Sequence, residues 1–343
     1  MPAERPLALV LGCAGEALSA EERRLFAAAD PLCFVIFRRN CRSRAQLRAL
    51  IAEFRACVGR PDAPVLVDQE GGRVARLRPP EWPAYPAPAR LAALPDSLAG
   101  EAAGLAARLI ADDLAAVGVT VDAAPVLDLP VADADPVIGD RAWGTDPMRV
   151  ARLGRAVCDG LLAGSVLPIV KHIPGHGRAR VDSHRACPRV ETSAAEMAQS
   201  DFAPFRALAA MPWAMTAHIV YAAIDDSAPA TFSRLVIDTA IRGDIGFAGV
   251  LISDDISMGA LAGGLAERTR RALDAGCDLV LHCTGVFAEM VEVTEAAMPM
   301  SPECEARIGR GEKLRRDSGR PFDRGAAEAR LAELTALAGR PGA

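Results

Sequence analysis

Short apolar runs of β-strand character alternate with longer segments of helical composition along almost the whole chain. This alternation is typical of βα units arranged around a parallel sheet. We expect strands at residues 7–13, 32–38, 65–70, 119–125, 166–172, 213–220, 249–254 and 279–283. A sheet of eight such strands favours closure into a barrel. The pattern therefore predicts an α/β fold of the (β/α)8 barrel, or TIM, type.

The same alternation would also fit an open, doubly wound sheet. The first strand-to-helix turn, from Gly12 to Glu16, lacks the G-x-G-x-x-G pattern of dinucleotide-binding folds, which argues against that alternative. No segment reads as a linker between domains. We therefore expect residues 1–343 to form a single catalytic domain, with charged helical segments at about 302–338 packed on the outside of the barrel.

Residues 79–95 form a Pro-rich loop that carries Trp82 and Tyr85. The loop is too long for a simple connection between a strand and a helix. Two interpretations remain open at this point: a wall or rim of the functional site, or a surface loop that contacts no ligand.

Composition narrows the range of partners. The formal net charge is −5 and the basic residues are scattered, so no basic stripe offers itself to nucleic acid. No stretch approaches the roughly 20 uninterrupted apolar residues that a membrane span needs. The nine cysteines form no Cys-x-x-Cys pair, and an odd, unpatterned set of this kind indicates a reducing compartment. We expect a cytoplasmic protein that binds neither nucleic acid nor membrane and acts as a monomer.

Polar residues that are uncommon in a protein core gather where the apolar runs end. In a (β/α)8 barrel these strand ends meet at one face, where such enzymes build their active sites. The pattern predicts one concave polar site there. Its candidate residues are Asp68, Gln69, Glu70, Asp122, Lys171, His172, His218, Asp254, Asp255 and His282.

The segment from Lys171 to His184 holds three of the five histidines of the chain. Its proline and glycines prevent a regular helix, so His172 and His176 are not a helical pair of zinc ligands. If residues 182–184 are extended, the Asp182 carboxylate lies on the same side as the His184 imidazole and can hydrogen-bond it. Such a pair is a poised acid and base, because histidine titrates near ~6.5 and a neighbouring carboxylate shifts its pKa upward.

A second chemical candidate is the apolar run that ends in Asp254 and Asp255. Successive side chains of a strand point to opposite faces. One carboxylate can therefore enter the site while the other caps a helix or holds nearby backbone. Two adjacent catalytic carboxylates acting side by side are disfavoured.

Three segments of the chain resemble glycoside hydrolase family 3, and within it the bacterial β-N-acetylhexosaminidases. Residues 171–184 read Lys-His-Ile-Pro-Gly-His-Gly, four residues, then Asp-Ser-His, as in the N-acetylglucosaminidase branch of the family. Residues 67–74 (Val-Asp-Gln-Glu-Gly-Gly-Arg-Val) and 253–258 (Ser-Asp-Asp-Ile-Ser-Met) are similar to two further family blocks. The resemblance therefore spans most of the chain.

The resemblance implies a retaining glycosidase that needs no cofactor and no metal. It assigns the nucleophile to Asp254 and the general acid/base to His184, with Asp182 as the partner of that histidine. It implies substrate contacts from Asp68, Arg76, Arg141, Lys171 and His172. Around Arg141 the chain reads Arg-Ala-Trp where the family pattern leads us to expect Arg-Ser-Phe.

The implied substrate is a muropeptide fragment of the cell wall, GlcNAc-1,6-anhydroMurNAc with or without its peptide, from which terminal non-reducing GlcNAc is removed during peptidoglycan recycling. Phosphate in place of water as the acceptor stays open. His176 is expected to be chiefly structural.

Two alternatives belong to other functional classes. A metal-dependent barrel hydrolase would use His172, His184, His218 and Asp254 as ligands. A sugar-binding barrel that has lost its activity is the non-enzymatic alternative, and the presence of Asp182, His184 and Asp254 together argues against it.

Overall fold

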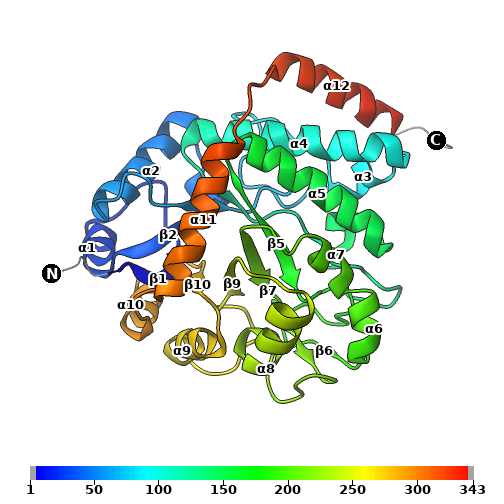
Figure 1. Ribbon diagram of the computed structural model, residues 1–343. Helices are drawn as coiled ribbons and strands as arrows, with labels where there is room; N and C mark the ends of the chain where they lie inside the picture. The colour runs from blue at the N-terminus through cyan, green and yellow to red at the C-terminus, as the bar shows by residue number, and fades with distance from the viewer. Residues whose placement is uncertain (1–4, 339–343) are drawn as a thin grey trace.

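The computed structural model describes residues 5–338 and contains a closed parallel barrel of eight strands, as predicted (Figure 1). Its strands follow one another around the barrel in the order β1, β2, β3, β4, β5, β7, β9 and β10. Their bounds are β1 Leu7–Leu11, β2 Pro31–Ile36, β3 Val65–Val67, β4 Val121–Asp122, β5 Leu167–Ile173, β7 Trp213–Thr216, β9 Val250–Asp255 and β10 Leu279–His282. Each of the eight predicted strands corresponds to one of them.

Helices follow the strands and form the outer layer. They are α1 Ala20–Ala29, α2 Arg44–Cys57, α3 Pro88–Ala92, α4 Asp96–Val117, α5 Pro147–Ala163, α6 Ala194–Gln199, α7 Phe202–Ala207, α8 Arg234–Val236 with its continuation Ile237–Asp244, α9 Leu265–Ala275 and α10 Phe287–Ala296. A small parallel sheet that the sequence pattern did not predict joins β6 (Arg189–Val190) to β8 (Val220–Tyr221).

Two helices complete the described chain. Helix α12 (Arg324–Leu337) packs on α4, outside the barrel (Figure 1). Helix α11 (Pro302–Ser318) instead crosses the end of the barrel at which the strands begin, since its Gly311 lies against Pro212 and Trp213 and its Arg307 pairs with Asp278. Helix α12 thus lies against the helix layer, whereas α11 covers the base of the barrel. No helix between residues 5 and 338 is long and apolar enough to span a membrane.

Alternating positions of the strands divide the core into two parts. One face of each strand packs against the helices, and the other fills the barrel. The interior is filled by Ala8, Val10, Leu66, Val121, Leu167, Ile169, Trp213, Met215, Val250, Ile252, Leu279 and Leu281. Because this interior is packed solid, a ligand can bind only at an end of the barrel, and α11 covers one end.

Candidate active site

On three strands the series of inward-facing apolar residues continues into a charged residue at the next inward position. These residues are Asp68 after β3, Lys171 in β5 and Asp254 in β9. Strand periodicity alone therefore brings the three charges together at the carboxyl end of the barrel. This is the face at which the sequence predicted a polar site.

Five charged side chains form one continuous network there. Lys171 Nζ lies 2.9 Å from Asp68 Oδ1 and 2.6 Å from Glu70 Oε1. Arg76 Nη2 donates to Asp68 Oδ2 at 2.9 Å, and Arg141 donates to both oxygens of Glu70 at 2.8 and 2.9 Å. Three cations and two carboxylates thus alternate, and four of the five are residues that the resemblance assigned to substrate binding. Glu70, which joins Lys171 to Arg141, was missing from that assignment.

Burial alone would neutralise these groups, but their mutual attraction is stronger. Burial lowers the pKa of Lys171, yet Asp68 and Glu70 outweigh it and raise that pKa above its ordinary value. Burial likewise raises the pKa of Glu70, whereas Lys171 and Arg141 bring it down to about 2. The pKa of Asp68 is lowered for the same reason by Lys171 and Arg76. Asp68, Glu70 and Lys171 are therefore charged at neutral pH.

Gln69 folds the loop that places Arg76 beside Asp68. Its side-chain oxygen accepts hydrogen bonds from the backbone N–H groups of Arg76 and Leu77, and its side-chain nitrogen donates to Leu77 O. Its own backbone N–H donates to Asp122 Oδ1 at 2.9 Å. Gln69 thus has a structural role.

Asp128 organises the neighbouring histidines and was not predicted. It is 1% exposed; its Oδ2 lies 2.7 Å from His172 Nδ1, and its Oδ1 accepts the backbone N–H groups of His172 and His176. A carboxylate at Nδ1 requires the proton on that nitrogen, so Nε2 of neutral His172 is left as an acceptor. One signal was available in the sequence, because Asp128 follows shortly after the apolar run of β4.

Asp254 and Asp255 have separate roles, as their alternation predicted. Asp255 accepts hydrogen bonds from Ser257 N, Ser257 Oγ and Cys283 N, so it holds backbone around the strand end. Burial raises the pKa of Asp254, but His218, His172 and the N–H of Asp255 together hold it below its ordinary value. Asp254 is thus an ionised, half-buried carboxylate at the end of its strand.

The Asp182–His184 hydrogen bond is present, but the local conformation is not the one expected. His184 Nδ1 lies 2.7 Å from Asp182 Oδ1. Residues 182–186 form a turn rather than an extended segment, because Arg185 N and Ala186 N both donate to Asp182 O and His184 N donates to Asp182 Oδ1. Asp residues favour such turns by bonding backbone two positions ahead. The His184 side chain is 62% exposed, so its imidazole faces solvent.

His218 is not available to a metal ion. Its Nε2 lies 3.0 Å from Asp255 O, which can only accept, and its Nδ1 lies 2.7 Å from Thr231 Oγ1. Both ring nitrogens are therefore occupied. The metal-dependent alternative loses one of its four ligands, and within residues 5–338 no group of three or more His, Cys, Asp or Glu side chains is arranged to hold a metal ion.

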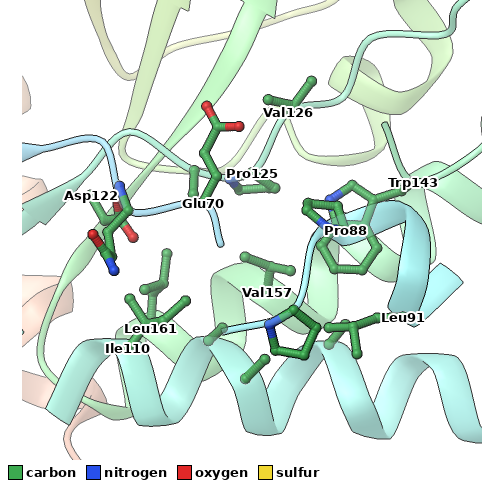
Figure 2. Close-up of a pocket in the computed structure, with 16 residues that line it drawn as sticks. Glu70, Pro88, Leu91, Ile110, Asp122, Pro125, Val126, Trp143, Val157 and Leu161 are labelled. Atoms are coloured by element: carbon green, nitrogen blue, oxygen red, sulfur yellow. Dashed lines mark hydrogen bonds between the residues drawn. The ribbon is translucent and has the colours of Figure 1, made fainter. Parts of the chain in front are cut away.

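Asp122 lies outside the site, contrary to expectation. It follows the inward residue Val121, so its side chain points to the helix layer, where a cavity of about 20 Å³ separates β3 and β4 from α4 and α5. Figure 2 shows Asp122 on one side of this cavity and Trp143 on the other. The cavity has room for about one water molecule and none for a sugar. Burial raises the pKa of Asp122 well above its ordinary value.

The Pro-rich loop packs against the segment that carries Asp68, Glu70 and Arg76 of the charged network. Gly72 N donates to Tyr85 O at 2.9 Å, and Pro86 O is so close to Gly71 that a Cβ there would lie 2.4 Å from it. Pro86 and Pro88 also line the cavity of Figure 2. The loop therefore packs against residues 68–76 and supports their conformation.

The fold and the site define a barrel enzyme with an ionised aspartate beside a buried cluster of cations. Residues 16–310 match the glycosyl hydrolase family 3 N terminal domain. The chain belongs to glycosyl hydrolase family 3 and is a glycoside hydrolase, as the three sequence segments predicted.

Curated relatives and a solved structure agree with this membership. The chain is 42% identical over 282 residues to a beta-hexosaminidase of Alkalilimnicola ehrlichii, covering 80% of each protein. It is 39% identical over 307 residues to a beta-hexosaminidase of Pseudomonas aeruginosa, covering 88% of this chain and 90% of the relative. The fold is similar to that of NagZ from Neisseria gonorrhoeae in complex with N-trifluoroacetyl-D-glucosamine, with a TM-score of 0.86, 33% identity and coverage of 98% and 100% of the two chains.

Proposed function

We propose that the protein is a retaining β-N-acetylglucosaminidase that acts through a covalent aspartyl intermediate. The observation that carries the proposal is the position of Asp254, an ionised, half-buried carboxylate at the barrel end beside the charged network. The relatives named beta-hexosaminidase and the solved structure with a bound glucosamine derivative support an N-acetylated amino sugar as the substrate.

In the first step the Asp254 carboxylate attacks the anomeric carbon, and the glycosidic C–O bond breaks. Protonated His184 gives its proton to the departing oxygen. In the second step His184 takes a proton from water, the water oxygen attacks the anomeric carbon, and the bond to Asp254 breaks. Two inversions retain the anomeric configuration.

The other residues hold the sugar and the acid/base. Asp68, Arg76, Lys171 and Arg141 offer fixed acceptors and donors for sugar hydroxyls, and His172 offers Nε2 as an acceptor. Asp182 orients His184 through the hydrogen bond at Nδ1 of its ring.

Turnover of a chromogenic β-GlcNAc glycoside is the first test, because an inactive sugar-binding barrel would bind it without releasing the chromophore. Trapping with a 2-fluoro sugar followed by peptide mapping identifies the nucleophile. A label on any residue other than Asp254 would contradict the assignment.

The natural substrate we propose is GlcNAc-1,6-anhydroMurNAc, with or without its peptide, processed in the cytoplasm during peptidoglycan recycling. Mass spectrometry of purified muropeptides after incubation should show loss of one GlcNAc. The same assay in phosphate buffer distinguishes water from phosphate as the acceptor, because phosphorolysis would give GlcNAc 1-phosphate.

A further inference from the structure

The loop that carries the proposed acid/base is fixed at a buried residue between the two members of the pair. Ser183 is 3% exposed, although the His184 side chain beside it is 62% exposed. The Ser183 hydroxyl lies 3.0 Å from Nε2 of His176, whose ring is also buried. His176 in turn is held by its backbone N–H, which donates to Asp128 at 2.6 Å.

The same loop rests on the segment that follows the strand of Asp254. Ala260 N donates to Ser183 O at 3.1 Å, and Gly259 N donates to His184 O at 3.2 Å. A Cβ on Gly259 would lie 2.8 Å from His184 O and 2.9 Å from Arg185 O, so the two backbones touch directly. Residues 183 and 184 are thus held by the backbone of residues 259–260 on one side and by the Ser183–His176 hydrogen bond on the other.

We infer that Ser183 and His176 are positioning residues whose hydrogen bond sets where the Asp182–His184 pair stands relative to Asp254. The inference rests on the acid/base function proposed above. Ser183 and His176 do not touch the reacting atoms; they act through the loop. Asp128 extends the connection to His172, so the sugar-binding side of the site and the acid/base loop share one anchor.

Leaving-group dependence tests the inference, because an acid helps only a leaving group that needs a proton. In Ser183→Ala, kcat/KM for an alkyl β-GlcNAc glycoside should fall about 10-fold, the upper end for one lost hydrogen bond. For the 2,4-dinitrophenyl glycoside, whose leaving group departs as an anion, it should change less than about 2-fold. Ser183→Thr keeps the hydroxyl and should recover most of the alkyl activity.

Two reference variants separate the possible failures. His184→Ala should show the same selectivity in stronger form; an equal loss on both glycosides would overturn the acid/base assignment and this inference with it. If His184→Ala is selective but Ser183→Ala is not, the positioning inference is wrong and the proposed function stands. Ser193→Ala, which removes the cap of α6, controls for a purely structural loss and should lower stability without any selectivity.

A double-variant cycle tests the bond itself. His176→Phe keeps an aromatic ring of similar size and should reproduce the selectivity of Ser183→Ala. The variant with both changes should be no more impaired than the worse single variant, because each removes the same contact. Losses that multiply would show that the two residues act independently and would overturn the inference.

Discussion

One buried carboxylate, Asp128, controls both the tautomer of His172 and the backbone of His176. Its Oδ2 lies 2.7 Å from His172 Nδ1, and its Oδ1 accepts His176 N at 2.6 Å. Burial raises the pKa of Asp128, but the neighbouring His172 and His176 bring it below its ordinary value, so the carboxylate is charged. A residue outside the predicted set therefore determines which nitrogen of His172 is left as an acceptor.

Asp128→Asn should weaken substrate binding by presenting the wrong nitrogen. The amide can donate to His172 Nδ1, which moves the ring proton to Nε2 and removes the acceptor. Loss of a charge-assisted hydrogen bond suggests a fall in kcat/KM of about 10- to 100-fold, carried mainly by KM. Steady-state kinetics on a chromogenic β-GlcNAc glycoside measures it. A variant with unchanged KM would refute the tautomer argument.

Glu70→Gln should lower stability as well as binding. The substitution leaves Lys171 and Arg141, both buried, with one negative charge fewer between them. Removing one partner of a buried charged network typically costs about 3–5 kcal/mol. Urea denaturation measures the loss. Glu16→Gln, which breaks a pair with Arg42 at exposed side chains, is the matched control and should cost less than about 1 kcal/mol.

The sequence predicted the barrel well because its strands are separate apolar runs, and predicted Asp68, Lys171 and Asp254 because they continue those runs at strand ends. It could not place Asp122 by the same rule. Whether a strand-end residue faces the barrel or the helices depends on its register, and Asp122 directly follows an inward residue. One position along a strand decides between the site and the cavity of Figure 2.

The turn at residues 182–186 was missed for a different reason. The spacing of Asp182 and His184 is compatible with both an extended segment and a turn. The turn depends on the backbone hydrogen bonds to Asp182 O and on the close backbone contact with Gly259, which lies more than 70 residues later in the chain. Contacts between such distant segments are not readable from local pattern. The sequence places Asp128 near a strand end, but it does not reveal the bonds of Asp128 to His172 and His176.

Gly177→Ala should disrupt the site through the backbone. A Cβ at Gly177 would lie 2.0 Å from Leu129 O, so the segment beside His176 would have to move away from the one that carries Asp128. Overpacking of this kind costs about 1–3 kcal/mol, and we expect kcat/KM to fall at least about 10-fold. Gly100→Ala in α4 is the control: apart from the adjoining backbone of its own helix, no described atom lies within 4 Å of a Cβ built there, and the change should stabilise the helix by about 0.5–1 kcal/mol. Thermal unfolding should therefore show a lower melting temperature for Gly177→Ala and a higher one for Gly100→Ala. In steady-state kinetics, kcat/KM should fall in Gly177→Ala and stay unchanged in Gly100→Ala.

His176 should make stability depend on pH between about 6.5 and 4. Burial lowers the pKa of its ring from 6.5 to about 4, and among residues 5–338 its Nδ1 has no hydrogen-bond partner. Between these values the unfolded chain binds a proton on this ring that the folded chain does not. The contribution is therefore present in full above pH 6.5 and is lost as the pH falls towards 4, with a slope of about 1.4 kcal/mol per pH unit.

Comparison with His176→Phe isolates this contribution, because other groups titrate in the same range. Asp122, whose pKa is raised, acts in the opposite direction, and His218, whose pKa is lowered, acts in the same one. The unfolding free energy of the natural protein minus that of His176→Phe should decrease as the pH falls from 6.5 to 4, because only the natural protein carries the imidazole ring. In Ser183→Ala the ring is retained, so its pH slope should stay close to that of the natural protein. Equal slopes in the natural protein and His176→Phe would mean that the ring titrates alike in the folded and unfolded chains.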